Sequence, residues 1–244
     1  MVDRTEIVHL LREHFDIDGD AHILDDGAVD VDGHVYLRER SHVTELPVQF
    51  NHVSGHAVFS NHHLKSLKGS PRTVGRDFSC SRNQITSLEH GPAQVSGSYI
   101  CNHNQLTNLV GAPVQAVEMM ECSHNLLTSL EGAPQECTES FWCHGNQLTN
   151  LKHLPRVHTG YLNFSNNPLE SLEGWDYATQ AQCILTCNPH LPLLRCLQSD
   201  SVDLHAAPWT VTTIMSKYAG QGKAGAIRCA GELIKAGYKE NARW

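Results

Sequence analysis

The stretch that decides the fold is residues 78–98, FSCSRNQITSLEHGPAQVSGS, which is followed by residues 99–119, YICNHNQLTNLVGAPVQAVEM, and residues 120–140, MECSHNLLTSLEGAPQECTES. The three segments are each 21 residues long and carry similar residue types in the same places. The period is clearest in five asparagines: Asn83, Asn104, Asn125, Asn146 and Asn167. A fixed period of this length is typical of one supersecondary unit that is stacked repeatedly. The sequence therefore predicts a solenoid.

Other positions of the repeat show how one coil is built. Each unit reads apolar-x-Cys-x-x-Asn-x-Leu-Thr-x-Leu-x-Gly-x-Pro, with variants. The apolar residue and the cysteine alternate with period two, so both side chains are expected to enter the coil interior from a short parallel strand. The Gly-x-Pro element, as in residues 132–134, breaks regular structure and favours tight turns on the other side of the coil.

The repeated asparagines are interpreted as structural residues. An asparagine suits the bend after a strand because its short amide can replace backbone hydrogen-bond partners. We expect the stacked side chains to form a structural ladder by bonding the backbone of the next coil.

These motifs resemble the leucine-rich repeat family, whose core pattern is L-x-L-x-x-N/C-x-L-x-x-L in coils of about 20 to 29 residues. The resemblance covers residues 31–190. It implies an α/β solenoid with short parallel strands and about eight coils. The Asn-Gln-Leu-Thr coils and the segment from Leu233 to Trp244 are also similar to leucine-rich repeat proteins of tailed bacteriophages. That similarity implies a phage-encoded interaction protein.

The flanking segments are expected to cover the two ends of the solenoid, because a terminal coil would otherwise expose its apolar interior. We predict an N-terminal helical cap at residues 1–28, a solenoid at 29–200 and a C-terminal helical subdomain at 201–244. Strands are expected near these residues: Val35, Ala57, Phe78, Tyr99, Met120, Phe141, Leu162 and Cys183. In the C-terminal subdomain, one helix is expected from Pro208, and a second, amphipathic helix is expected to contain Ile227, Leu233 and Ile234 and to stop near Gly237.

Charge is distributed unevenly along the chain, whose formal net charge is −8. Residues 1–40 hold eleven acidic and four basic residues, a balance of −7, whereas residues 208–244 hold two acidic and six basic residues, a balance of +4. An acidic solenoid is poorly suited to nucleic acid, because neutralising phosphates supplies most of that affinity. The basic tail could contact an acidic partner or membrane lipid, or it could be a solvated helix face.

The nine cysteines do not indicate disulfides. Cysteines in one interior column of parallel strands have their Cβ vectors side by side, so we expect buried thiols. The odd number of cysteines, the lack of a secretory signal and the lack of a long apolar run favour a cytoplasmic protein without a membrane span.

Motifs for catalysis and for cofactors are weak in this sequence. The Gly-Gln-Gly-Lys run at 220–223 lacks the earlier glycine of a phosphate loop. Asp16, Asp18 and Asp20 alternate like the start of a calcium loop, but Gly27 stands where its glutamate would be. Polar repeat positions explain the histidines better than a zinc site does. We therefore expect no enzyme activity, no metal and no cofactor.

The outward strand positions are the candidate binding surface, because solenoids usually bind on the concave face. Aromatic anchors surrounded by small polar residues are typical of interface hot spots. The predicted binding residues are Ile100, Met119, Glu121, Trp142, His144, Tyr161 and Asn163. The alternative is that Trp142 folds against its neighbours or is covered by a terminal helix.

The sequence predicts a non-enzymatic protein–protein interaction module that binds an unidentified protein partner, in the phage case a host cytosolic protein that it engages or inhibits. Two alternatives remain open. One is a structural component of a virus particle that is held through its terminal subdomains. The other is a small metal- or ligand-binding protein that uses His103, Glu121 and His124. Self-association is a further expectation, since solenoids with imperfect caps can stack end to end.

Overall fold

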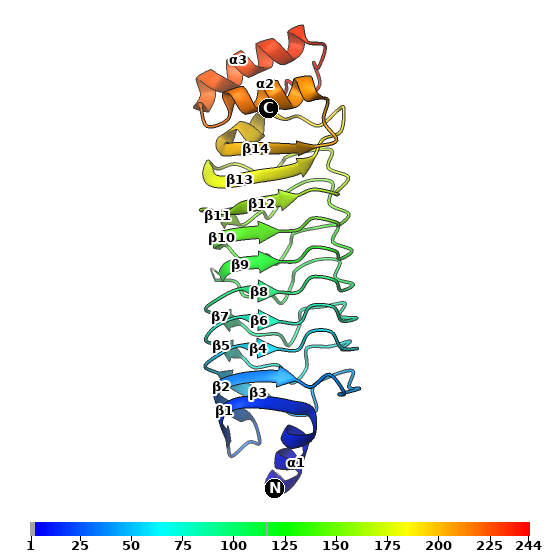
Figure 1. The fold of residues 1–244 in the computed structure, drawn as a ribbon, viewed down its shortest axis with the longest axis vertical. Coiled ribbons are helices and arrows are strands. Elements are labelled where there is room, and N and C mark those ends of the chain that lie inside the picture. Colours follow the sequence, from blue (N-terminus) through cyan, green and yellow to red (C-terminus); the bar gives the residue numbers. More distant parts are fainter. Residues whose placement is uncertain (1–2, 116) are drawn as a thin grey trace.

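The computed structural model describes residues 3–115 and 117–244. Strands of successive coils stack into a long column, with the N-terminus at one end and the C-terminus at the other (Figure 1). The described residues form a parallel β-solenoid of about eight coils with three α-helices, two of them at the C-terminal end. The solenoid prediction is therefore confirmed.

The first ladder of strands carries the repeat. Successive partners are 21 residues apart, as in Phe78 opposite Tyr99 and Tyr99 opposite Met120, so one sequence period is one coil. The strands of this ladder are β2 (Val29–Leu37), β4 (Ala57–Val58), β6 (Phe78–Ser79), β8 (Tyr99–Ile100), β9 (Val117–Glu121), β10 (Glu136–Trp142), β12 (Tyr161–Phe164), β13 (Thr179–Thr186) and β14 (Ser199–His205). The eight expected strands are all present, and β14 is an additional one.

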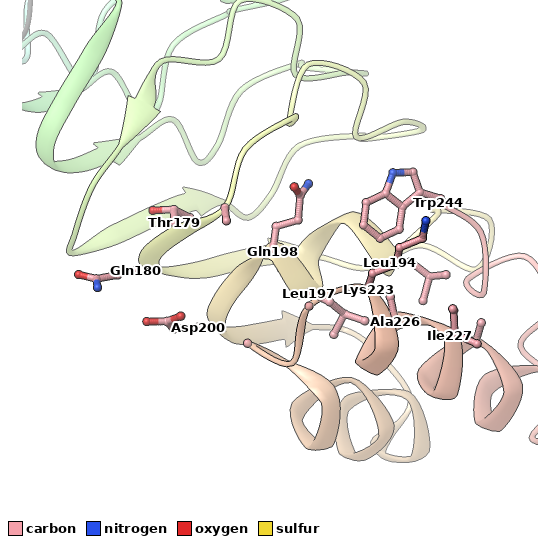
Figure 2. A pocket seen from close by; sticks show the side chains of 14 residues that line it. Thr179, Gln180, Leu194, Leu197, Gln198, Asp200, Lys223, Ala226, Ile227 and Trp244 are labelled. Atoms are coloured by element: carbon pink, nitrogen blue, oxygen red, sulfur yellow. The ribbon is translucent and has the colours of Figure 1, made fainter.

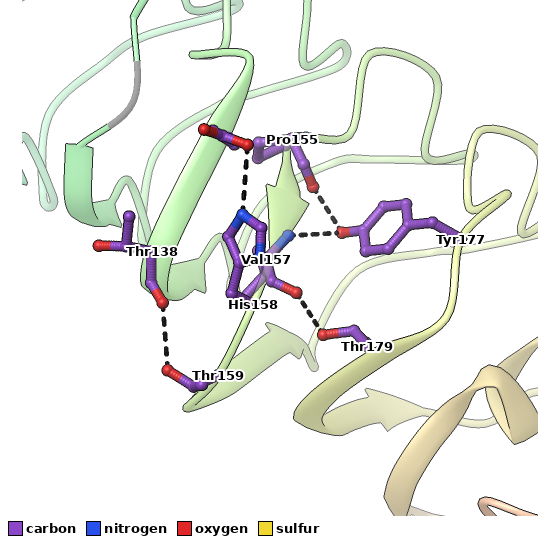
Figure 3. Close-up of polar contacts among 8 residues, drawn as sticks. Thr138, Pro155, Val157, His158, Thr159, Tyr177 and Thr179 are labelled. Carbon is purple, nitrogen blue, oxygen red and sulfur yellow. Dashed lines mark hydrogen bonds and ion pairs between the residues drawn. The ribbon is translucent and has the colours of Figure 1, made fainter.

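A second ladder lies on the other side of the coil, where the sequence predicts only turns. It contains β3 (Phe50–Val53), β5 (Thr73–Val74), β7 (Gln94–Val95) and β11 (Arg156–Val157), together with the first residues of β9 and β10. Side chains also join coils here (Figure 3). The Tyr177 hydroxyl donates to the Pro155 carbonyl at 2.5 Å, and the Thr159 hydroxyl donates to the Thr138 carbonyl at 3.1 Å.

The asparagine ladder is present, but each side chain bonds the preceding coil and not the following one. Asn125 Nδ2 donates to the carbonyls of Cys101 and Cys122, each at 3.1 Å, and Asn125 Oδ1 accepts from the Leu106 N–H at 3.0 Å. The same three bonds recur at the other members: Asn83, Asn104, Asn146 and Asn167. Each amide therefore closes its own bend and fixes the coil before it.

The interior of the column is apolar and continuous. Phe59, Phe78 and Tyr99 follow one another, with ring centroids 6.0 and 5.0 Å apart. The nine cysteines are all free and buried, and burial raises the pKa of the Cys80 thiol to about 12. These thiols therefore act as small apolar fillers.

The N-terminal end differs from the expected helical cap. Helix α1 (Arg4–His14) begins at Asp3, whose carboxylate accepts from the N–H groups of Thr5 and Glu6. The helix then gives way to strand β1 (Phe15–Ile23), which pairs antiparallel with β2. The expected N-terminal helix is therefore present and ends at His14, and residues 15–23 of the cap segment form a strand instead. The alternating aspartates of this segment belong to a strand with period two, and no calcium loop forms there.

The C-terminal end is covered by the short 3-10 helix η1 (Leu194–Gln198) and by helices α2 (Trp209–Tyr218) and α3 (Gly222–Lys235). The helical part thus starts at Trp209, because residues 199–205 form β14. The Asn241 side chain ties the tail to the last coil by donating to the Leu191 carbonyl at 2.9 Å. The expected second helix is present as α3, whose buried face contains Ala226, Cys229 and Leu233, whereas Ile227 and Ile234 are exposed.

Replacing Asn125 by alanine tests the structural role of the ladder. The change leaves two carbonyls and one N–H without their partner in a buried setting, so we expect a loss of about 2 to 4 kcal/mol in the free energy of unfolding. Urea denaturation followed by circular dichroism measures it. The exposed Gln147→Ala is the control, with an expected change below about 0.5 kcal/mol. Equal losses in both variants would contradict the role assigned to Asn125.

Candidate functional site

The outward-facing positions of β6, β8, β9, β10, β12 and β13 form one surface, called the ladder face below. The structure places six of the seven predicted binding residues on these strands, whereas His144 lies two residues beyond the end of β10. Tyr161 is the most open, with 44 % of its surface exposed, whereas Glu121 is 6 % exposed. The others are half-buried: Ile100, Met119, Trp142, His144 and Asn163. The ladder face therefore carries one exposed aromatic residue, Tyr161, among half-buried side chains.

Trp142 lies at the centre of the face. It stands between Glu121 on β9 and Asn163 on β12 in the strand register. Tyr161 is two residues before Asn163, which makes it the diagonal neighbour of Trp142 on the same face. The indole N–H of Trp142 is buried and has no hydrogen-bond partner among the described residues. An unsatisfied buried donor costs about 1 to 3 kcal/mol.

The Glu121 side chain is buried, and its carboxylate bonds a residue just after its own strand. Its carboxylate accepts from the Ser123 hydroxyl and, at 3.3 Å, from the Ser123 N–H. Asn163 and Ser165 repeat this arrangement two coils later, where the Ser165 hydroxyl donates to Asn163 Oδ1 at 2.8 Å. Burial raises the pKa of Glu121, and the bonds from Ser123 oppose that effect only in part.

A row of histidine rings borders the ladder face. The rings of His103 and His124 are stacked, with centroids 4.5 Å apart and planes 12° apart, and His144 lies edge-on to His124 at 4.9 Å. Burial, followed by the neighbouring His124, lowers the pKa of His103 and of His144. These two rings are therefore uncharged at neutral pH.

Metal donors do not converge beside these rings. Among the residues that the structure describes, no three His, Cys, Asp or Glu side chains are grouped so as to hold a metal ion. The alternative site of His103, Glu121 and His124 is thus only partly assembled, as a stacked pair of histidines.

A second surface, a cleft between the last coil and α3, is not among the expected sites (Figure 2). Its volume is about 990 Å³. Leu194, Leu197, Ala226 and Ile227 line it together with Trp244, while Lys223 also borders it. Ile227 and Trp244 are 67 % and 56 % exposed. The apolar residues within the basic tail were the only feature of the sequence that pointed to this cleft. Whether they are exposed depends on how α3 docks, which the sequence does not show.

Comparisons of the chain with protein-family models, curated proteins and solved structures give no match. The leucine-rich repeat and bacteriophage resemblances therefore remain expectations from the sequence. No helix in the described part of the chain combines the length and the apolar character needed to cross a membrane.

The buried carboxyl group predicts a pH effect on stability. Because the folded state raises the pKa of Glu121 above its ordinary value of 4.5, the folded state holds this proton more tightly than the unfolded state. The stabilising contribution is complete below 4.5 and is lost as the pH rises through the folded pKa. Glu121→Gln keeps an acceptor for Ser123 and does not titrate. Its stability relative to the wild type should therefore increase from about pH 4 to about pH 7, as measured by urea denaturation. A constant difference across this range would contradict the raised pKa.

Proposed function

We propose that this protein is a non-enzymatic interaction module that binds a protein partner through the ladder face. The observation that carries the proposal is that the exposed Tyr161 and the half-buried Trp142 lie on neighbouring strands of one face, as diagonal neighbours in the register. Aromatic side chains of this kind dominate the affinity of many protein interfaces. A partner that lays an apolar side chain against the two rings would bury the exposed part of Tyr161 and of Trp142.

The backbone of the ladder favours recognition by side chains. Carbonyl and N–H groups of each coil are used by the neighbouring coils, as in the bond from the Cys122 N–H to the Trp142 carbonyl at 2.8 Å. A surface held in this way loses little conformational freedom when a partner binds, which lowers the entropic cost of association. The side chains thus present a preformed pattern.

The chemistry around the two aromatic residues indicates a partner surface of mixed character. Ser140 and Ser165 are small and polar, and Asn163 is half-buried between the strands that carry Trp142 and Ile184. The row of His103 and His144 adds uncharged ring surface at neutral pH. We therefore infer that the partner presents an apolar group with neighbouring hydrogen-bond acceptors, and not a strongly charged patch.

The biological setting is proposed from the sequence resemblance to leucine-rich repeat proteins of tailed bacteriophages. In that setting the chain engages a protein of the host cytosol and inhibits it by covering its surface. The support is the Asn-Gln-Leu-Thr coils together with the C-terminal segment that ends in Trp244.

Affinity capture from a bacterial lysate with the tagged protein and with a Trp142→Ala, Tyr161→Ala variant tests the proposal. The matched control is Val114→Ala, Leu126→Ala, which removes two exposed apolar side chains outside the ladder face. We expect mass spectrometry to find a partner with the wild type and with the control but not with the ladder-face variant. For the purified pair, the dissociation constant should rise about 100-fold or more in that variant, as truncation of two hot-spot residues implies.

Thermal unfolding of the three proteins shows whether each is folded at the capture temperature. A Trp142→Phe, Tyr161→Phe variant keeps the ring packing but removes the indole N–H and the phenol hydroxyl, and we expect it to bind with intermediate affinity. The same partner captured equally by the wild type and by the folded ladder-face variant would refute binding through this face.

A further inference from the structure

Strand β1 is an open edge of the sheet at the N-terminal end of the column. The Arg38 N–H donates to the His14 carbonyl at 2.9 Å, and the Leu24 N–H donates to the Ala28 carbonyl at 2.8 Å. Both pairs share the register of β1 with β2, and hydrogen-bonded pairs alternate along an antiparallel ladder. The even-numbered residues of β1 therefore bond β2, and the odd-numbered residues direct their N–H and C=O groups away from it.

Two further observations fix the same alternation. The Gly33 N–H donates to Ser54 Oγ at 2.9 Å on the far side of β2, as expected for a residue that does not bond β1. A Cβ atom built on Gly19 would lie 2.1 Å from the Asp32 carbonyl oxygen, which shows that this side of the Gly19 Cα atom faces β2. The N–H and C=O groups of Gly19 consequently point outward.

The outward edge is accessible in the middle of the strand. Asp18, Gly19, Asp20 and Ala21 are all exposed, and the described residues offer no hydrogen-bond partner to the outward groups of Ile17, Gly19 and Ala21. An unpaired strand edge is a ready template for another strand. Helix α1 therefore leaves this part of the edge open.

A groove of about 350 Å³ lies between α1 and β1, and its lining combines apolar side chains with those of Arg12 and Arg38. Its apolar lining includes Val8 and Leu11 from the helix and Ile17, Ala21 and Ile23 from the strand. A strand added at the edge of β1 would place alternate side chains on this side of the sheet. Apolar side chains at those positions would extend the cover of the first coil.

The other face of β1 is acidic. Asp16, Asp18 and Asp20 alternate along it, and Asp32 stands opposite Asp20 in the register. Asp16 pairs with Arg38 at 2.8 Å, whereas no described basic side chain lies within ion-pair distance of Asp18 or Asp20. Pairing of β1 with β1 of a second copy would bring like charges together, which is unfavourable. The charge thus selects a basic partner strand.

We propose that β1 binds an extended partner segment in which lysine or arginine alternates with apolar residues, so that the segment adds as a strand to this edge. Its backbone pairs with Ile17, Gly19 and Ala21, its basic side chains lie beside Asp18 and Asp20, and its apolar side chains enter the groove under α1. This site is separate from the ladder face and does not depend on the function proposed for that face.

Amide hydrogen exchange of the full chain, measured by NMR with a short blocked peptide of alternating lysine and valine, tests the register directly. We expect the peptide to slow exchange about tenfold or more at Ile17, Gly19 and Ala21, while Asp18 and Asp20, already bonded to β2, change little. The same peptide with N-methyl groups along its pairing edge should not bind, and a glutamate–valine peptide should bind much more weakly.

Protein variants separate charge from backbone pairing. Asp18→Asn, Asp20→Asn should weaken binding about tenfold at low salt, and added salt should reduce the difference. Ala21→Pro, which removes one outward N–H, should also weaken binding. The control Glu89→Gln, Glu131→Gln removes two exposed acidic groups from distant turns and should bind like the wild type.

Three results would overturn the proposal. The first is that the lysine–valine peptide binds without slowing exchange at the odd-numbered amides of β1. The second is that the glutamate–valine peptide binds as tightly as the lysine–valine peptide. The third is that, without peptide, these amides become more protected as the protein concentration rises. The last result would identify a second copy as the occupant of the edge.

Discussion

The structure depends on one constraint, which is that the backbone at the bend after each strand must be satisfied in every coil. A single asparagine meets this constraint by donating to two carbonyls and accepting from one N–H of the preceding coil. Because those groups lie on two adjacent coils, the side chain sets both the shape of the bend and the register of the stack. His62 takes the same place in an earlier coil, where its Nε2 lies 3.1 Å from the Leu37 carbonyl. The order of the ladder face follows from this register, since residues one period apart are brought side by side.

The repeat could be predicted from the sequence because a coil interacts mainly with its neighbours. Leu106 or Phe141 is buried for reasons that are visible within one period. The second ladder was not predicted, because strands such as β7 (Gln94–Val95) closely follow the Gly-x-Pro position of the repeat, which favours turns, and lack the repeated apolar-x-Cys pattern of the first ladder. A left-handed bend was also missed. His103 and His124 have positive φ angles of 53° and 52°, and the signs of this bend in the sequence were Gly145 and Asn166 in the same column.

The ends of the chain could be predicted less well, because their contacts do not follow the period. Strand β1 is determined by pairing with β2 across a turn, and the segment before it has the spacing of a helix. In α3, Ile227 is one of the apolar residues of the expected amphipathic helix, yet docking against α2 and η1 buries Ala226 and Leu233 and leaves Ile227 exposed. The exposure of Trp142 or Glu121 was likewise beyond the sequence, since it depends on how neighbouring side chains pack on the sheet. The sequence therefore predicted where the candidate site lies but not how far its side chains are exposed to solvent.

Native-state hydrogen exchange of the free protein, resolved by residue, tests the central constraint most directly. The amides of Ile85, Leu106, Leu127 and Leu148 lie in turns, but each donates to an asparagine of the following coil at 3.0 Å. Their exchange should be as slow as that of the ladder amides of Cys101 and Cys122, because opening any of them requires separation of adjacent coils. If these four amides exchange as fast as those of the exposed turns, the asparagine ladder does not hold the coils together.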